Sequence, residues 1–209
     1  MMSKKEVPLH ALSAYLPENT LEPVLYYLNT YKILLTITRE RRTILGDYRY
    51  AKGDSYHRIS VNGNLNKYAF LITLLHELAH LITFEKFGRT VAPHGKEWKA
   101  TFSHLLSRFL HLQVFPNDVT QALTRSVHNP AASSCADEFL MRVLRGYDMM
   151  KDDILLIEEI TEGGLFQLED GRIFKRGEKL RKRYKGHEVQ TGKVYLFSPL
   201  YEVRPVQQR

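Results

Sequence analysis

Cysteine is almost absent from this chain of 209 residues, which restricts how the fold can be held together. Cys135 is the only one, so no disulfide can form within the chain and no cluster of thiolates can bind zinc. Long apolar runs are also missing: no stretch reaches eighteen uninterrupted apolar residues, so we expect no membrane span. The first twenty residues lack an apolar segment of the secretory type, and we therefore expect a cytoplasmic protein.

Charge is distributed unevenly along the chain. The net charge is +7, a mild bias toward polyanionic partners. Residues 152–170 hold seven acids and no bases, whereas residues 172–209 hold eleven bases and three acids. This change of sign predicts two parts: a first domain of residues 1–150 and a small basic module of residues 151–209. A chain of this length can bury a good-sized core.

The hydrophobic pattern predicts a mixed α+β fold. A short helix at residues 20–31 precedes three strands at 32–38, 43–50 and 57–61, the second of them interrupted by a turn or bulge at Gly46-Asp47. A long helix follows at 67–87, ended by Gly88, and further helices are expected from about residue 94, at 117–127 and at 136–146. Beyond residue 152 the chain consists of short apolar segments separated by glycine turns, which predicts a β-rich module.

The strongest chemical signal is HELAH, residues 76–80, inside a predicted helix that is apolar nearly all round. Buried imidazoles and carboxylates are costly unless something compensates them. On a helix, His76 and His80 project from one face, one turn apart, and their nitrogens can bind one tetrahedral Zn²⁺. Glu77, beside them, can take a proton from a water that attacks a carbonyl. The alternative is an ordinary helix with two satisfied core histidines.

A catalytic zinc needs three protein ligands, and the sequence offers more than one candidate for the third. The spacing HExxHxxGxxH is absent, because Lys86 stands where the third histidine would be. Glu97, on the next predicted helix, would suit a zincin with a glutamate ligand. We favour His94, because it follows Pro93 and the loop that starts at Gly88 can return the chain to the metal.

The segment "LLHELAHLITFEKFGRTVAPHGKEWKATF", with "LGDYR" and "RISVN" upstream, closely resembles the SprT-like metalloprotease family, which is related to the eukaryotic protease Spartan. The resemblance covers about residues 10–145. It implies a zincin-like domain, in which a small sheet packs on the active-site helix, with one zinc on His76, His80 and His94 and with Glu77 as the catalytic base. It also implies hydrolysis of peptide bonds, with DNA or DNA-bound proteins as partners.

The C-terminal region departs from the pattern of many relatives, which end in a zinc ribbon that carries cysteines. Residues 172–203 keep the strand-and-turn pattern of a ribbon but contain no cysteine, so a second, structural zinc is not expected. Residues 172–185 contain eight bases and one acid, with Phe174 and Tyr184 between them. Bases with aromatics suit phosphate contacts and base stacking. The same run is also typical of the solvated face of a small sheet.

These observations predict a zinc-dependent endopeptidase with a protein substrate. The strand at residues 57–61, directly before the active helix, is a candidate for pairing with an extended substrate, although it is equally typical of an ordinary sheet strand. The competing hypothesis is a nucleic-acid-binding or adaptor protein whose zinc site is structural or vestigial. The complete HExxH favours the hydrolase, because a structural site needs no Glu77 and has no open coordination position.

Overall fold

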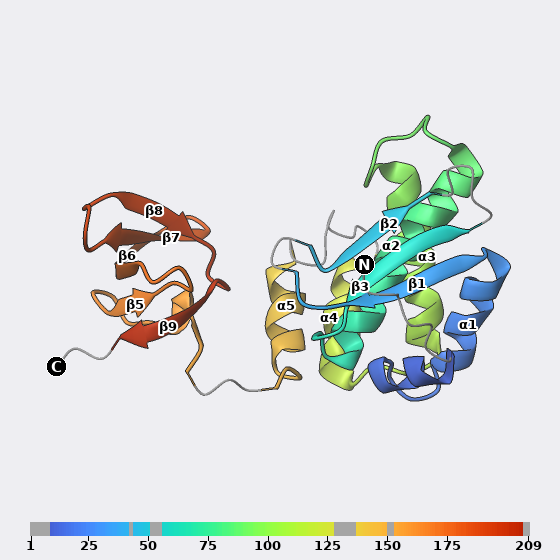
Figure 1. Ribbon diagram of the computed structural model, residues 1–209, viewed down its shortest axis with the longest axis horizontal. Helices are drawn as coiled ribbons and strands as arrows, with labels where there is room; N and C mark the ends of the chain where they lie inside the picture. The colour runs from blue at the N-terminus through green and yellow to red at the C-terminus, as the bar shows by residue number, and fades with distance from the viewer. Residues whose placement is uncertain (1–8, 42–43, 51–55, 128–136, 150–152, 207–209) are drawn as a thin grey trace, which may run out of the picture. The chain divides into compact units, whose positions relative to one another are not determined.

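The computed structural model describes residues 9–41, 44–50, 56–127, 137–149 and 153–206. The chain divides into two units, residues 1–148 and residues 149–209. The first unit combines helices with a three-stranded sheet, and the second consists mainly of strands (Figure 1). The predicted mixed α+β character is therefore confirmed. Cys135 lies outside the described residues.

The first unit contains three strands and five α-helices within the described ranges. It begins with the 3-10 helix η1 (Leu9–Tyr15) and continues with α1 (Leu21–Thr30), β1 (Ile33–Thr38), β2 (Gly46–Arg49), β3 (His57–Asn62), α2 (Lys67–Phe87), α3 (Lys96–His111), α4 (Asn117–Ser126) and α5 (Glu138–Arg145). Helix α2 has the predicted bounds. Helix α3 begins two residues after His94, because His94 has a left-handed backbone (φ 56°) that cannot continue into a right-handed helix.

The three strands form a sheet with the order β1–β3–β2, so β3 is the central strand. It pairs in parallel with β1 and antiparallel with β2. The predicted interruption at Gly46 is wrong: Gly46 and Asp47 lie within β2, opposite Val61 and Ser60 of β3. Within the described ranges, β2 pairs on one side only and is an edge strand of this sheet.

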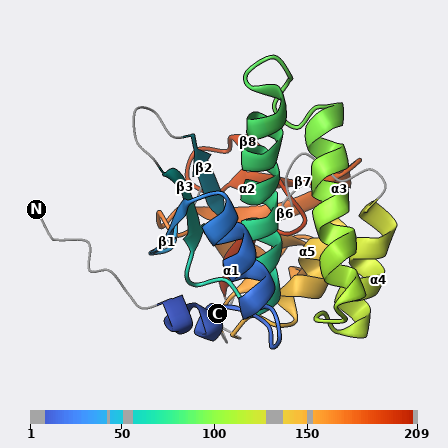
Figure 2. The ribbon, with the colours of Figure 1, turned by 90° about the vertical axis from the view of Figure 1, so that its right-hand side faces the viewer.

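Helix α2 lies at the centre of the core of the first unit. Thirteen of its residues are buried, and they occupy all sides of the helix rather than a single stripe. It packs against β2 and β3 and against α3, and Figure 2 shows α2 and α3 side by side. Burial on all sides means that every polar side chain in the middle of α2 must find its partner inside the protein.

Both ends of α2 are fixed by local chemistry. At its start, the Asn66 side-chain oxygen accepts hydrogen bonds from the backbone N–H groups of Tyr68 and Ala69, while the Asn66 amide donates to the carbonyl oxygen of Leu144. At its end, Gly88 adopts a positive φ of 61°, a backbone conformation that residues with a side chain rarely adopt. Although α2 is apolar, no helix among the described residues is long and apolar enough to span a membrane.

A buried polar network fixes the chain that leads into β2. Asn62 is 1% exposed; its side-chain oxygen accepts from Arg41 Nε at 2.7 Å, and its amide donates to the carbonyl oxygens of Arg41 and Ile44. Arg41 also donates to Ser60 Oγ at 2.9 Å. Because these bonds join the segment before β2 to β3, they determine where Gly46, the first residue of β2, lies.

The second unit is an antiparallel sheet with a core of its own. Its strands are β4 (Leu155–Leu156), β5 (Leu165–Gln167), β6 (Ile173–Leu180), β7 (Arg183–Glu188), β8 (Val194–Phe197) and β9 (Glu202–Val206), in the order β4–β9–β5–β6–β7–β8, with the 3-10 helix η3 (Ile157–Glu159) after β4. The rings of Phe166, Phe174 and Phe197 pack together at its centre. Gly186 leaves room for them, since a Cβ there would clash with the Phe197 ring. The predicted short strands are confirmed, and they are held by aromatic packing.

Candidate metal centre

Three histidines converge between α2 and the start of α3. His76 and His80 come from successive turns of α2, and His94 comes from the loop that joins the two helices. The Nε2 atom of His76 lies 3.2 Å from Nε2 of His80 and 3.2 Å from Nε2 of His94. The cluster is the one group of three or more histidine, cysteine or acidic side chains, among the residues described, whose ligand atoms could hold one metal ion.

The spacing of these nitrogens fits a tetrahedral metal. Zn–N bonds of about 2.0–2.1 Å at tetrahedral angles place two ligand nitrogens about 3.3–3.4 Å apart, close to the two distances between the ring nitrogens. His76 is also buried, and its Nδ1 has no hydrogen-bond partner among the described residues. Burial of such a ring costs free energy, and a metal bound to its Nε2 atom would offset part of that cost. The donor set therefore fits zinc, and a metal would compensate the buried rings.

The surroundings keep all three rings neutral, as metal binding requires. Burial, followed by the charges of His80 and His94, lowers the pKa of His76 to about 3. Burial, followed by the charge of His94, lowers the pKa of His80 to about 4. Burial also lowers the pKa of His94. At neutral pH each ring therefore has a lone pair for a metal, and protons compete for it only in acid.

The backbone at His94 is strained in a way that serves this geometry. His94 has a φ of 56°, a conformation that costs a residue with a side chain about 1–2 kcal/mol. It stands between Pro93 and Gly95, and Gly95 is the N-cap residue of α3. The left-handed residue turns the chain sharply just before the helix and returns the imidazole to the two rings of α2. Strain of this kind is concentrated at functional sites.

Trp98, which was not among the predicted site residues, forms an apolar wall beside the histidines. Its ring centroid lies 4.7 Å from that of His76, 5.3 Å from that of His80 and 4.6 Å from that of His94. The side chain is 1% exposed and packs on Phe102. Trp98 follows His94 by four residues, about one helical turn, and this spacing was the available signal in the sequence. The wall holds the rings in place and excludes water from one side of the cluster.

The carboxylate of Glu77 lies against Gly46, the first residue of the edge strand β2. A Cβ atom on Gly46 would lie 2.6 Å from Glu77 Oε1 and 2.8 Å from Thr73 Cγ2. Only a residue without a side chain leaves room for the carboxylate at this point. Glu77 is 6% exposed, so the position of its side chain is determined by this contact and by the helix that carries it.

Burial, together with the charge of Asp47 and against the charge of Arg41, raises the pKa of Glu77 to about 8. A divalent cation on the neighbouring imidazoles would act in the same direction as Arg41, because a nearby positive charge favours the ionised carboxylate. The environment thus brings the pKa of the Glu77 carboxyl close to neutral pH. A group with such an affinity suits a general base.

Glu97 and His104, both on α3, lie outside the histidine cluster. Glu97, the alternative third ligand, is not part of the three-nitrogen cluster; it lines a groove with Tyr26 and Lys86, formed by α1, α2 and α3. Its absence from the cluster follows from helix geometry, because Glu97 projects from a different side of α3 than Trp98, which packs on the three rings. His104, on α3, is exposed and lines the same groove.

The aromatic side chains of the basic C-terminal segment are not available for base stacking. Phe174 is 0% exposed and Tyr184 is 8% exposed, and both belong to the core of the second unit. The expectation that they would stack on bases is therefore wrong. They alternate with exposed residues along β6 and β7, and the register of the two strands turns these positions inward.

Some bases of this segment are paired within the unit. Arg172 forms ion pairs with Asp170 and Glu188, and Lys185 forms one with Glu178. Residues 181–183, at the turn between β6 and β7, are exposed bases. The basic surface thus includes this turn, and its aromatic neighbours serve the core.

Part of the first unit matches a known family. The sequence model of the SprT-like family matches residues 25–120, a range that contains the three histidines, Glu77, Gly46 and Trp98. No solved structure gives a significant match to this chain.

Several curated relatives have the name Protein SprT. The protein of Proteus mirabilis (strain HI4320) is 39% identical over 95 residues, which are 44% of this chain and 47% of that protein. That of Yersinia enterocolitica is 58% identical over 31 residues, 15% of this chain and 18% of the relative. The Escherichia coli (strain K12) protein is 52% identical over 42 residues, 20% of this chain and 25% of the relative. The chain thus matches less than half the length of each of these relatives.

Trp98 is the single tryptophan of the chain, so its fluorescence reports on the metal centre. We expect Co²⁺ added to metal-free protein to quench the emission with a break at one equivalent, since an open-shell ion would bind next to the indole. The His94→Ala variant serves as the control and should lose this break. Emission that stays constant while elemental analysis shows one bound cobalt would contradict the proposed position of the site.

Proposed function

Through residues 25–120 the chain belongs to the SprT-like family, and from this premise we propose that it is a zinc-dependent endopeptidase with a zincin-like active site. The observation that carries the proposal is the arrangement of α2. Its His76 and His80 meet His94 at spacings suited to zinc, and the adjacent Glu77 is buried against the edge strand of the sheet. Three nitrogen ligands leave one coordination position open, as a catalytic zinc requires.

The residues of the chain divide the chemistry between them. His76, His80 and His94 would hold one zinc, and Trp98 and the left-handed turn at His94 keep these rings in position. When bound, zinc lowers the pKa of a water and polarises the carbonyl of the scissile peptide bond. Glu77 takes the proton from the attacking water and then donates it to the leaving amine.

The sheet offers an edge for an extended substrate, although not at the strand considered first. β3 (His57–Asn62) was the candidate for substrate pairing, but it is paired on both sides, with β1 and with β2. Pairing with β3 is therefore ruled out, because its backbone groups already form the ladders. We assign this role to β2, the edge strand whose Gly46 touches Glu77. A peptide added there would be held through backbone hydrogen bonds beside the proposed base.

We extend the proposal to proteins associated with DNA as substrates. Its support is the resemblance to the Spartan-related proteases, together with the net charge of +7 and the exposed bases at residues 181–183. Since the aromatics of that segment are buried, DNA would be contacted through its phosphates, and binding would weaken steeply as salt is added.

The Glu77→Gln variant tests the function directly. Zinc content should stay at one per chain, because the three histidines are unchanged, whereas cleavage of a loosely folded basic protein should fall about 10²–10⁴-fold with loss of the general base. Metal analysis and a gel-based cleavage assay, with and without DNA, measure the two effects. Cleavage that persists in the variant would refute the role of Glu77. Zinc without cleavage in the wild type would favour a nucleic-acid-binding or adaptor protein.

Gly46→Ala should separate metal binding from catalysis. The new methyl group would displace the Glu77 carboxylate, and a misplacement of about 1 Å can reduce the rate about 100-fold. Zinc binding should be unaffected, because Gly46 does not contact the histidines. Gly146→Ala is the matched control, since its Cβ would meet no atom closer than 3.3 Å. Normal cleavage by Gly46→Ala would show that Glu77 does not need this space.

Asp47→Asn should change the pH dependence of cleavage. The charge of Asp47 contributes to the raised pKa of Glu77, so its removal lowers that pKa and leaves the base ionised at lower pH. The acid limb of the pH–rate profile should therefore move to lower pH. Asp170→Asn, in the second unit, is the control and should leave the profile unchanged. An acid limb that stays in place or moves to higher pH would contradict this electrostatic account.

A further inference from the structure

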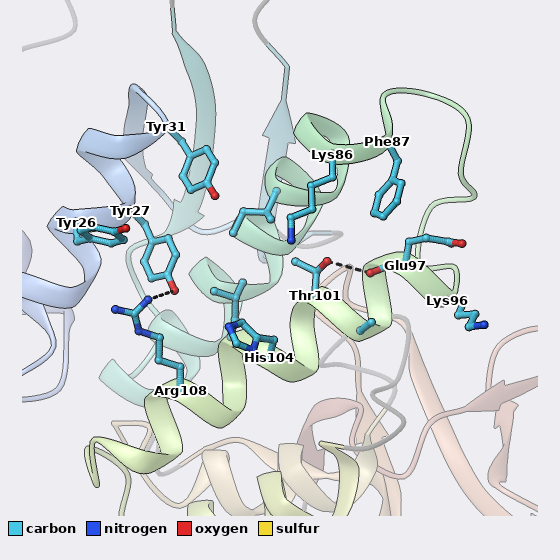
Figure 3. Close-up of a pocket in the computed structure, with 13 residues that line it drawn as sticks. Tyr26, Tyr27, Tyr31, Lys86, Phe87, Lys96, Glu97, Thr101, His104 and Arg108 are labelled. Atoms are coloured by element: carbon cyan, nitrogen blue, oxygen red, sulfur yellow. Dashed lines mark hydrogen bonds between the residues drawn. The ribbon is translucent and has the colours of Figure 1, made fainter.

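The first unit has a groove that shares no residue with the metal centre. It is formed by α1, α2 and α3, has a volume of about 530 Å³, and is shown in Figure 3. Along α3 its lining follows one stripe of the helix, through Glu97, Thr101, His104 and Arg108. A volume of this size is in the range of binding pockets for small ligands and side chains.

Apolar and aromatic side chains make up much of the lining. Tyr26 on α1 and Phe87 at the end of α2 are 55% and 42% exposed, although both are large and ring-bearing. Ile82 and Leu105 are buried beneath the groove surface. Ala100 lines it with only a methyl group. Exposed rings gathered around a hollow with aliphatic side chains are typical of surfaces that bind a partner.

Positive charge predominates around this apolar lining. Lys86, Lys96 and Arg108 line the groove, and Glu97 is the one carboxylate among its lining residues. Figure 3 shows Lys86 directed between the tyrosines of α1 and the helix α3. These charges would attract an anionic ligand and repel a cationic one.

Arg108 is held in place by the tyrosines of α1. Its Nη1 donates to the hydroxyl of Tyr27 at 3.0 Å, and its guanidinium lies 5.5 Å from the ring centroid of Tyr26. A guanidinium has five N–H donors, so one that is fixed in this way can also bind a carboxylate with little further loss of side-chain entropy.

We propose that this groove docks an acidic peptide segment that carries apolar side chains and belongs to a partner protein. The apolar lining accepts the aliphatic or aromatic side chains of the segment, and the three cations pair with its carboxylates. A groove between helices is a common site for such short segments. The proposal does not depend on zinc or on hydrolysis, so its failure would be distinct from that of the protease function.

The test starts from an unbiased selection of peptide ligands. The full chain with Glu77→Gln, which prevents loss of bound peptides by cleavage, is used to select from a random dodecapeptide phage library. Enriched peptides are synthesised with a fluorescein label, and their affinity is measured by fluorescence anisotropy. We expect the enriched sequences to combine Asp or Glu with Leu, Ile or Phe.

Two variants test the groove independently, one by changing its charge and the other by filling its volume. Lys86→Glu combined with Lys96→Glu reverses two exposed charges and should weaken binding about tenfold, the sum of a few exposed ion-pair energies. Ala100→Phe fills the groove without a change of charge and should also weaken binding about tenfold, since the apolar side chains of the peptide lose their place. Lys67→Glu, at the exposed start of the same helix α2, is the control and should leave the affinity unchanged. Circular dichroism verifies that each variant is folded.

Three results would overturn the proposal. They are a selection that enriches no sequence, enriched peptides without acidic residues, and peptides that bind equally well to both groove variants. A labelled single-stranded oligonucleotide is measured in parallel. If it binds to the wild-type groove and loses affinity in the same two variants while the peptides do not, the groove is a nucleic-acid site and the peptide proposal is wrong.

Discussion

The burial of two imidazoles and a carboxylate in the middle of α2 is the constraint on which the first unit depends. A helix that is apolar on all sides has no solvated face to which a polar side chain could turn, so each of these groups needs a partner from another element. For the imidazoles, the partners are each other and His94, and their nitrogens are placed so that they could hold a metal ion. The carboxylate lies against Gly46 of β2, where the absence of a side chain leaves room for it.

The residues around the imidazoles and those around the carboxylate come from different elements, α3 with the loop before it and β2. Helix α3 and the loop before it supply Trp98 and His94. Their rings orient the imidazoles of α2 and exclude water from them. The β2 side supplies Gly46 and the charge of Asp47, which set the position and proton affinity of Glu77. The network around Asn62 supports the second arrangement, because it fixes the strand that carries both residues. Because the imidazoles and Glu77 contact different elements, α2 can carry the proposed metal ligands and the proposed base without a steric conflict between them.

The parts of this structure that could be predicted from the sequence are those with local causes. The bounds of α2 follow from its apolar run, Asn66 and Gly88, and the pairing of His76 with His80 follows from helical spacing. The contact of Gly46 with Glu77 could not be predicted, because it depends on how a strand is positioned against a helix 31 residues later in the chain. The burial of Phe174 and Tyr184 depends on the register of two strands, and a composition of bases and aromatics does not reveal which side of a sheet they occupy.

The short distance along the chain between the three histidines has a consequence for the order of folding. All three lie within residues 76–94, so α2 and the loop after it can capture a metal ion with a small loss of loop-closure entropy. The surroundings of Glu77 need β2, which must first pair with β3. Under the proposed function, a newly made chain could bind zinc before Glu77 reaches its final position, and it would become active only when the sheet had formed.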